Sequence, residues 1–485
     1  MREIIFQSML FAVFFVCHSN DVFSKVYKVG SSRVYSSPNA LYLANVLENG
    51  DVVEIDAETY SGNSCLAKWT KDSITIRGIG GRPHMKANGL SIEGKAIWVI
   101  TGKDNIIENI EFSGVKVPDK NGAGIRQEGI GVTIRNCFFH HNETAFLSNN
   151  SEQGHILIEH SEFSHNGIGN GFSHNVYIGH VETLTFRYNY SHHANTGQTL
   201  KTRAFNNLIL YNRIMDESTG EASRLIDISN GGFAIVMGNL LMQGPNAQNG
   251  NMVGFGHEGL ENPGPYKFYF INNTCVNKRT SFANFIKVND AVSVSNISNN
   301  LFAGSHNSIV EGAMTTFEGN LIEEDIDKIK FFDESIYDYR LTEDSPAIDK
   351  GVIVDANPLD TLSLVPQFSY FHPRQKQQRV LLNGMPDIGA YELDLDAEPY
   401  VVISKVEKDI NSDYLLFPNP VREYLIVREK FNNAEFKIYT MQGNLKLSGR
   451  VKDERINMNS LSNGVYFLSI MDNGQYSPTF KVLKQ

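Results

Sequence analysis

Cysteine is scarce in this chain: its 485 residues include four, and one of them, Cys17, lies in the N-terminal apolar segment. The other three, Cys65, Cys137 and Cys275, are odd in number and widely separated, with no metal-ligand spacing. Such a set argues against a disulfide framework. We expect these thiols to be small buried apolar side chains.

A long hydrophobic run is also missing. The apolar stretch from Ile4 to Val16 is too short to span a bilayer, but it has the length of a signal-peptide core. We therefore expect residues 1–24 to be a signal peptide and the mature chain to have no transmembrane segment.

Positive charge is in the minority, with 43 Lys and Arg against 54 Asp and Glu and a net charge of −11. Proteins that bind nucleic acid neutralise its phosphates with a basic surface, so nucleic acid is not an expected partner. A local basic groove for an acidic polymer stays compatible with this composition, because net charge does not describe a single cleft.

A repeat runs through most of the chain. Alternating apolar runs such as Val132–Arg135 and Leu208–Tyr211 recur at intervals of roughly 20 to 34 residues and predict strands, with no helical pattern between them. Each run leads to an asparagine, except that His160 fills one place. The asparagines are Asn109, Asn136, Asn189, Asn212, Asn239, Asn273, Asn300 and Asn320. This spacing predicts an all-β fold, a right-handed parallel β-helix.

Asparagine suits such turns for two reasons. It tolerates left-handed backbone geometry, and stacked amides can hydrogen-bond from coil to coil. The pattern resembles the pectate-lyase-like proteins, as do the entry segments Gly50–Ile55 and Ile74–Pro83 and the closing segments Asp344–Asp349 and Asp387–Glu392. The resemblance implies a secreted, carbohydrate-active β-helix domain over residues 25–395.

The C-terminal part has a different pattern, with proline and Asn-Gly turns between short alternating strands. Leu416–Pro420, Ile438–Gly443, Asn463–Leu468 and the basic tail Lys481–Gln485 resemble the sorting domain of the type IX secretion system. The resemblance implies a small β-sandwich over residues 413–485 and export through the periplasm by that machinery, to the outer surface or the medium. The acidic residues 396–412 between the domains are expected to be a linker.

A β-helix has a filled interior, so a site must be built from outward side chains on adjacent coils, which stack about 4.8 Å apart. Counted from the repeat asparagines, Tyr177, Lys201 and Asp227 occupy equivalent outward positions on three successive coils. Arg203 points the same way as Lys201, and His174 precedes the first of these strands. We predict a substrate groove here.

These residue types suit β-elimination on a uronic acid. Arg203 is a permanent cation whose planar fork matches the substrate carboxylate. Lys201, beside a second cation and partly desolvated, is expected to have a depressed pKa and to act as the base. Tyr177 or His174 would be the acid, and Asp227 would orient Lys201.

Further substrate contacts are expected from Asp227, Arg224 and His257, and from His192 and His193 in a segment that could overhang the same face. His192 and His193 resemble a metal pair, but adjacent strand residues face opposite sides, so no zinc site is predicted.

A cofactor is not expected either. Lyases similar to chondroitinase B and alginate lyase carry a catalytic lysine on such a strand, and Lys201 fits that role. Those enzymes place acidic calcium ligands just before the lysine, whereas Asn195–Gln198 has no carboxylate. Calcium is possible, but the chain shows no ligand set for it, and Arg203 would replace the metal.

The preferred interpretation is a monomeric, secreted lyase for an acidic, uronate-containing polysaccharide. An inverting glycoside hydrolase would need two separated carboxyls, for which Asp227 and Glu258 are the available pair. A C5-epimerase would share the Lys and Tyr chemistry. A non-catalytic glycan-binding or adhesive β-helix would show exposed aromatics in place of clustered charges.

Overall fold

The computed structural model describes residues 24–354, 357, 363–381, 384–395, 421–427, 433–440, 444–472, 475–476 and 480–484. The expected signal peptide up to residue 23, the linker 396–412 and the turn motifs at 416–420 and 441–443 lie outside the described residues. The chain divides into two units. The first is built from residues up to Ile329 and from Pro346–Glu392, and the second from Lys330–Ser345 and from Leu393 onwards.

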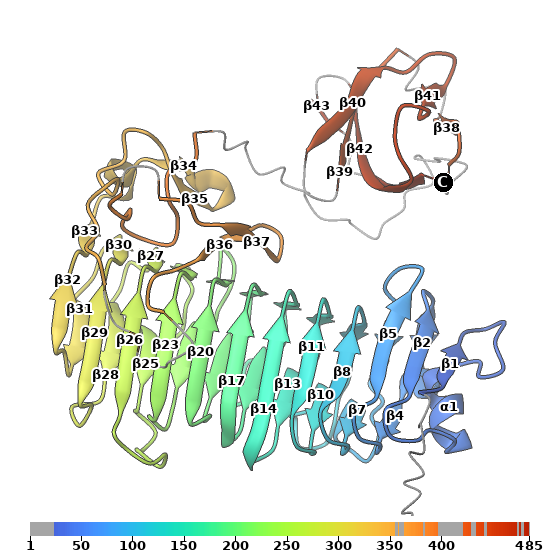
Figure 1. Cartoon of the computed structure of the whole chain (residues 1–485), viewed down its shortest axis with the longest axis horizontal. Coiled ribbons are helices and arrows are strands. Elements are labelled where there is room, and N and C mark those ends of the chain that lie inside the picture. The colour runs from blue at the N-terminus through green and yellow to red at the C-terminus, as the bar shows by residue number, and fades with distance from the viewer. Residues whose placement is uncertain are drawn as a thin grey trace, which may run out of the picture. The chain divides into compact units, whose positions relative to one another are not determined.

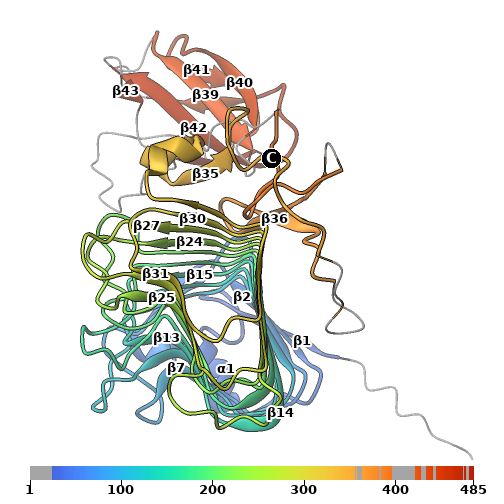
Figure 2. The ribbon, with the colours of Figure 1, turned by 90° about the vertical axis from the view of Figure 1, so that its left-hand side faces the viewer.

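The first unit is a parallel β-helix, which confirms the predicted fold class. Three parallel sheets run along it, and each coil contributes one strand to sheet A, then to sheet B, then to sheet C (Figure 1). Figure 2 looks along the stack, so that the strands of each sheet overlie one another.

Sheet A contains β1 (Val26–Val29), β2 (Val52–Asp56), β5 (Thr75–Ile79), β8 (Asn105–Glu108), β11 (Val132–Arg135), β14 (Ser151–Glu159), β17 (Val181–Arg187), β20 (Asn206–Leu210), β23 (Phe233–Met237), β26 (Lys267–Ile271), β29 (Val294–Ser298) and β32 (Thr316–Glu318). Sheet B contains β3 (Thr59–Ser61), β6 (His84–Lys86), β9 (Glu111–Ser113), β12 (Phe138–His140), β15 (Glu162–Ser164), β18 (Tyr190–His192), β21 (Arg213–Met215), β24 (Leu240–Gln243), β27 (Thr274–Asn277), β30 (Leu301–Ala303) and β33 (Leu321–Glu323). Sheet C contains β4 (Ala67–Trp69), β7 (Ala96–Ile100), β10 (Ala123–Gln127), β13 (Thr144–Ser148), β16 (Val176–Ile178), β19 (Leu200–Thr202), β22 (Ile226–Ile228), β25 (Asn251–Phe255), β28 (Asn284–Val288) and β31 (Ser308–Gly312).

Side chains of one kind stack on each other inside the coils. Phe112, Phe139 and Phe163 lie in consecutive strands of sheet B, with ring centroids 4.9 and 5.2 Å apart and nearly parallel planes. Burying one such side chain contributes about 1.5–3 kcal/mol, so the aromatic stack stabilises the coils that carry it. Cys65, Cys137 and Cys275 are free and buried, as expected.

An asparagine ladder follows the corner between sheets A and B. From Asn212 to Asn320, each ladder side-chain carbonyl accepts the backbone N–H and the side-chain amide N–H of the ladder asparagine one coil earlier, beginning with Asn189; for Asn212 and Asn239 both distances are 2.9 Å. These asparagines are buried except for the half-buried Asn320. The predicted coil-to-coil amide bonding is confirmed for them.

The prediction that the same asparagines take the left-handed turn position was wrong for this ladder. That position, one residue earlier in each coil, is held by Tyr188, Tyr211, Gly238, Asn272, Asn299 and Gly319. Asn109 and Asn136 do have positive φ, 57° and 51°, because they stand at the turn position and outside the ladder. The left-handed turn and the coil-to-coil hydrogen bonds were both expected of one asparagine, but in this ladder they belong to two adjacent residues.

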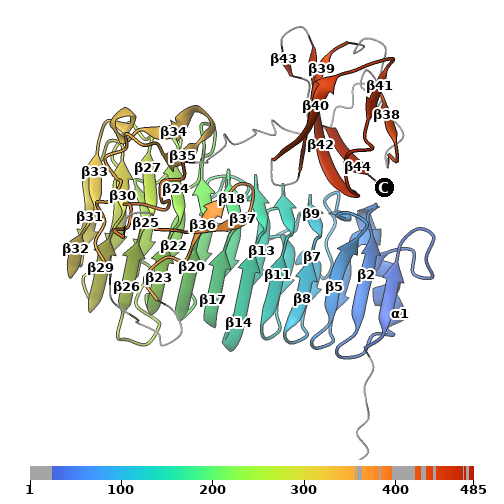
Figure 3. The same ribbon diagram turned by 45° about the horizontal axis from the view of Figure 1, so that its top comes forward.

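The N-terminal end and one flank of the β-helix are covered. Helix α1 (Pro38–Ala44) lies at the N-terminal end of the stack, where the Ser37 hydroxyl accepts the Ala40 N–H, and the short helices η1 (Gly62–Cys65) and η2 (Ile326–Ile329) lie within this unit. The hairpin of β36 (Phe368–Phe371) and β37 (Gln375–Gln378) lies over the coils near β18 (Figure 3). There Phe368 meets the rings of Tyr188 and Tyr211 edge-on.

The second unit is antiparallel. It contains β34 (Phe331–Asp333), η3 (Glu334–Ile336), β35 (Asp338–Leu341), β38 (Tyr424–Ile426), β39 (Glu435–Thr440), β40 (Leu445–Arg450), β41 (Arg455–Asn457), β42 (Gly464–Asp472), β43 (Gln475–Tyr476) and β44 (Phe480–Lys484). β39 lies between β40 and β42, and β38 pairs with β41. Ile438, Leu468 and Val482 are among the buried residues of its own small core.

Candidate functional site

The structure places the three residues of the predicted sheet C row in register, although Asp227, the last of them, has no solvent exposure. Tyr177 in β16 pairs with Lys201 in β19, and Lys201 pairs with Asp227 in β22. The next strand, β25, places Gly254 in the same row, so the row has no side chain beyond a hydrogen there. The alternation of the strands turns their apolar neighbours inward, which leaves the polar row on the outer face.

Two cations of this face bind one carboxylate. Lys201 Nζ lies 2.5 Å from Glu258 Oε1, and Arg203 Nη2 lies 2.6 Å from Glu258 Oε2. Burial alone would raise the pKa of Glu258, but the bonds and charges of Lys201 and Arg203 outweigh it, so this pKa lies below its ordinary value. Glu258 is therefore an anion held between the two cations.

A tyrosine hydroxyl and an amide complete the contacts of Arg203. Its Nε donates to the Tyr177 hydroxyl at 2.9 Å, and its Nη1 donates to Asn230 Oδ1. Asn230 in turn donates to the backbone carbonyls of Glu258 and Gly259, at 3.3 and 3.1 Å. Lys201 Nζ also lies 5.9 Å from the centroid of the Tyr177 ring. The guanidinium is thus fixed at three points.

Asp227 is buried beneath this surface, with no solvent exposure. Its Oδ2 accepts from Arg224 Nη1 and from Gln198 Nε2, both at 3.2 Å, and its Oδ1 has no hydrogen-bond partner among the described residues. Burial raises its pKa, against the charges of Arg224 and Lys201. The side chain that Asp227 orients is Arg224, not Lys201 as expected.

His174 is almost fully buried beside Tyr177, with ring centroids 5.5 Å apart. Its Nδ1 accepts the backbone N–H of Gln198 at 3.1 Å, so Nε2 carries the ring hydrogen. Burial, with the nearby charge of Lys201, lowers the pKa of His174 to about 3. At neutral pH His174 is an uncharged hydrogen-bond donor, which leaves Tyr177 as the better candidate for the acid.

His257 follows β25 and is half-buried, and its Nε2 has no hydrogen-bond partner among the described residues. Burial lowers the pKa of His257. The charges of Lys287 and Arg224 lower it further, whereas the charge of Asp227 opposes them.

His192 and His193 belong to another part of the coil. His192 ends β18 in sheet B, and His193 begins the corner between sheets B and C. The expectation that they face opposite sides was wrong, because their Nδ1 atoms lie 2.7 Å apart. His193 has a left-handed backbone, with φ of 49°, and this breaks the alternation of the strand.

Clusters able to hold a metal lie on sheet B in the described part of the chain. One is formed by His165, His192 and His193, and the other by His84, Glu111 and His140. On sheet C, the carboxylates of Glu258 and Asp227 are each bound to arginine or lysine.

Comparisons with known proteins agree with both units. Residues 415–485 match the model of the secretion system C-terminal sorting domain. A crystal structure of pectate lyase Pel9A matches the fold with a TM-score of 0.51 and 15% sequence identity, over 76% of this chain and 97% of that one. At this identity the likeness shows the fold alone. The sequence matches no curated protein.

The protein is therefore an exported parallel β-helix protein with a type IX sorting domain, destined for the cell surface or the medium. The tail implies interaction with the type IX secretion machinery. Among the described residues, no helix combines the length and the hydropathy needed to cross a bilayer.

Three residues of the sheet C cluster were missed or misassigned from the sequence. Glu258 was given a chemical role only as half of a hydrolase pair, whereas Asn230 and Gln198 were given none. The available signal was weak: Asn230 and Glu258 both follow the sheet C strand of their coils at a glycine-containing turn.

Proposed function

We propose that this protein is a polysaccharide lyase that cleaves a uronate-containing polymer by β-elimination on the outer face of sheet C. The proposal rests on one observation: Lys201 and Arg203 both form salt bridges to the carboxylate of Glu258. A pair of cations that holds one carboxylate in this way is suited to hold another, such as the carboxylate of a uronic acid.

The reaction requires three acts from the chain. The substrate carboxylate replaces Glu258 on Arg203, which withdraws negative charge and makes the C5 proton more acidic. Lys201, in its unprotonated form, takes that proton, and the electron pair of the C–H bond forms the C4–C5 double bond. The bond from C4 to the glycosidic oxygen breaks, and the Tyr177 hydroxyl gives its proton to that oxygen.

The buried residues around this face have no chemical step of their own; they position the reacting side chains. Asn230 and Tyr177 fix the Arg203 guanidinium, and the neutral His174 packs against Tyr177. Asp227 is not suited to a hydrolytic role, because it has no solvent exposure and is bound to Arg224. The pair of separated, accessible carboxyls that an inverting hydrolase needs is thus not supported by this geometry.

The test uses the secreted full-length protein with alginate, pectate and chondroitin as separate substrates. The ultraviolet absorbance of the unsaturated product is followed over time. Lys201→Ala is expected to lower kcat by at least about 10³-fold, because the base is lost, and Arg203→Ala to lower kcat/KM by about 10²-fold or more.

A matched control is Lys287→Ala. Lys287 stands in the same row of sheet C, next to Gly254, and pairs with Glu311 at 2.8 Å. It should leave the rate unchanged. Reducing ends without absorbance would indicate hydrolysis, a change of C5 configuration without cleavage would indicate an epimerase, and retention of polymer without either would indicate a glycan-binding protein.

A further inference from the structure

A short sequence unit occurs twice on sheet B. Glu-Phe-Ser at Glu111–Ser113 is followed in the next coil by the pair His140–His141, and Glu-Phe-Ser at Glu162–Ser164 is followed by the pair His192–His193. In both cases the strand register is the same, and the first histidine lies beside the serine of the preceding coil. The unit thus places a carboxylate and two imidazoles in one neighbourhood.

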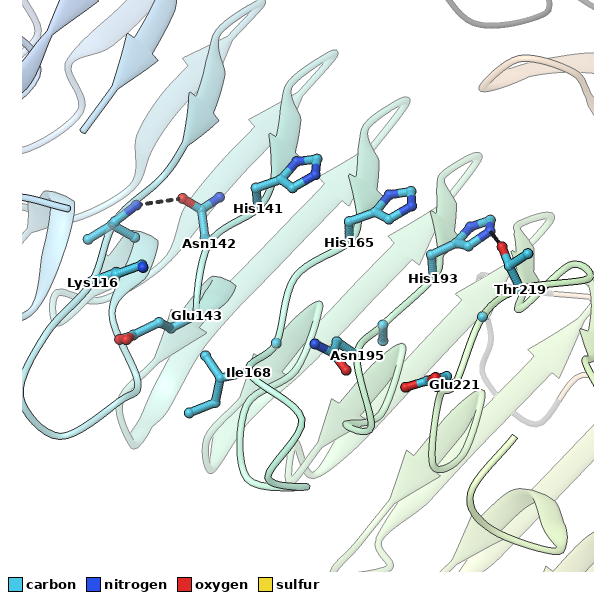
Figure 4. Close-up of a pocket in the computed structure, with 14 residues that line it drawn as sticks. Lys116, His141, Asn142, Glu143, His165, Ile168, His193, Asn195, Thr219 and Glu221 are labelled. Carbon is cyan, nitrogen blue, oxygen red and sulfur yellow. Dashed lines mark hydrogen bonds between the residues drawn. The ribbon is translucent and has the colours of Figure 1, made fainter. Parts of the chain in front are cut away.

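The second copy brings three imidazoles together. His192 Nδ1 and His193 Nδ1 are 2.7 Å apart, and the ring of His165 stacks on that of His193 with centroids 4.6 Å apart and planes 11° from parallel. One ring nitrogen of each of the three lies within 4.8 Å of those of the other two. Figure 4 shows His141, His165 and His193 in a row along the corner of the coils.

The outer nitrogens of the pair are directed at oxygen partners. His192 Nε2 lies 3.5 Å from Glu162 Oε1, and His193 Nε2 lies 3.1 Å from Thr219 Oγ1. When Nε2 carries the hydrogen, the lone pairs of both Nδ1 atoms converge. Metal-binding histidines are oriented in this way by a carboxylate or another acceptor at the second ring nitrogen.

The backbone is unfavourable for histidine at these places. His141, His165 and His193 have φ of 54°, 56° and 49°. For a residue with a Cβ, left-handed geometry costs roughly 1–2 kcal/mol, and glycine or asparagine would fit more easily. Three consecutive coils carry an imidazole at this corner, and the three rings stack on one another along it.

We propose that His165, His192 and His193 bind one divalent cation of the late first-row transition metals. Imidazole nitrogen favours copper, nickel and zinc over calcium or magnesium, which take oxygen ligands. At metal–nitrogen distances of about 2.0 Å, two nitrogens 2.7 Å apart subtend about 85°. That angle is close to the right angle of tetragonal copper(II) or nickel(II) and well below the tetrahedral angle of zinc.

The site has room for a further ligand. His165 and His193 line a hollow of about 500 Å³ at the corner of sheets B and C, together with Glu143, Asn195 and Glu221 (Figure 4). A cation bound by three protein nitrogens still has coordination positions left, which water or an oxygen of a bound molecule can fill.

The experiment adds copper(II), nickel(II) or zinc(II) chloride separately to the full-length protein, prepared without a polyhistidine tag. Bound metal is measured by equilibrium dialysis, and the copper-loaded protein by electron paramagnetic resonance. We expect the tightest binding for copper, and a copper spectrum split by at least two nitrogens. His193→Asn and His165→Asn should each weaken binding at least 10-fold, and asparagine keeps the left-handed backbone in both.

His155→Asn is the matched control, because His155 is an exposed imidazole on β14 outside the cluster; it should bind metal as the wild type does. Glu162→Gln should weaken binding by a smaller factor. The proposal is overturned if the two cluster variants bind like the control, or if copper shows no nitrogen splitting. Thermal unfolding establishes that the variants are folded, and if His193→Asn is not, the exposed His165 decides the outcome.

Discussion

At the scale of single residues, Glu258 has the most informative environment. It comes from the segment after β25, yet it neutralises Lys201 and Arg203, which lie 57 and 55 residues earlier in the chain. Under the proposed lyase function, its carboxylate occupies the position that the carboxylate of a bound uronate would take. In the free protein Glu258 is then an internal competitor of an anionic ligand.

Glu258→Gln tests this competition. The amide removes the negative charge and keeps the size, so an oligouronate should bind about 3- to 10-fold more tightly to the variant, as measured by calorimetry. Glu261→Gln is the control, because Glu261 pairs with His180 at 3.2 Å and not with the two cations. Equal affinities of wild type and Glu258→Gln would contradict the assigned competition.

Asp216 provides a prediction on pH. Burial raises its pKa to about 7, although it accepts the backbone N–H groups of Gly244 and Ala222. Between the ordinary value of 3.8 and about 7, the unfolded chain releases this proton and the folded chain keeps it. The free energy of unfolding therefore falls as pH rises through that range. Below and above the range, the contribution of Asp216 does not change with pH.

Asp216→Asn should remove this slope. Between pH 4.5 and 7.5 the free energy of unfolding of the wild type should fall relative to the variant, by an amount on the order of 3 kcal/mol. Denaturant unfolding at the two pH values measures it. Asp104→Asn, at a largely exposed carboxyl, is the control. Parallel pH profiles of wild type and Asp216→Asn would refute the assignment.

Part of the residue-level site could be predicted from the sequence, because strand alternation and repeat spacing are local properties. They placed Tyr177, Lys201 and Asp227 in one row. The partner of the two cations could not be predicted in this way, since Glu258 reaches them from a segment whose path depends on the three-dimensional fold. His192 and His193 were misjudged because a single left-handed residue cancels the alternation rule.

At the scale of elements, the asparagine ladder holds the coils in register. Asn239 accepts from the backbone and the side chain of Asn212, and it donates to Ile209 O and Asn273 Oδ1. Its side chain therefore serves several buried polar groups at once. The sequence predicted the ladder. The ladder asparagine, however, stands one residue after the left-handed turn residue. Because asparagine also occurs at the turn position in some coils, as in Asn272 and Asn273, the sequence pattern does not separate the two positions.

Asn239→Ala should destabilise the β-helix by about 2–4 kcal/mol, because buried donors and acceptors lose their partners. The exposed Asn136 gives the contrast. Asn136→Gly keeps the left-handed turn and loses only the exposed side-chain bonds to Arg82 and Asn109, so its cost should be below about 1 kcal/mol. Denaturant unfolding of the two variants provides the comparison. A similar loss in both would mean that the ladder adds no stability.

At the scale of the whole molecule, the sorting domain determines where the β-helix works. A chain that ends before residue 415 should accumulate in the periplasm of a host with type IX secretion, while the full chain reaches the surface or the medium. Cell fractionation with immunoblotting measures this. The full chain with Lys201→Ala is the control and should be exported normally, whereas release of the truncated chain would show that the tail is dispensable.

The coils differ in length while the ladder does not. Successive ladder asparagines from Asn189 are 23, 27, 34, 27 and 20 residues apart, yet their amide bonds stay between 2.9 and 3.2 Å. The longest interval, from Asn239 to Asn273, is the one that contains Glu258. The extra residues lie in the segments between strands and leave the hydrogen bonds of the ladder intact. These segments can therefore be lengthened, exchanged or grafted with little loss in the free energy of unfolding. Ligand preference can then change through these segments while the scaffold that carries them stays the same.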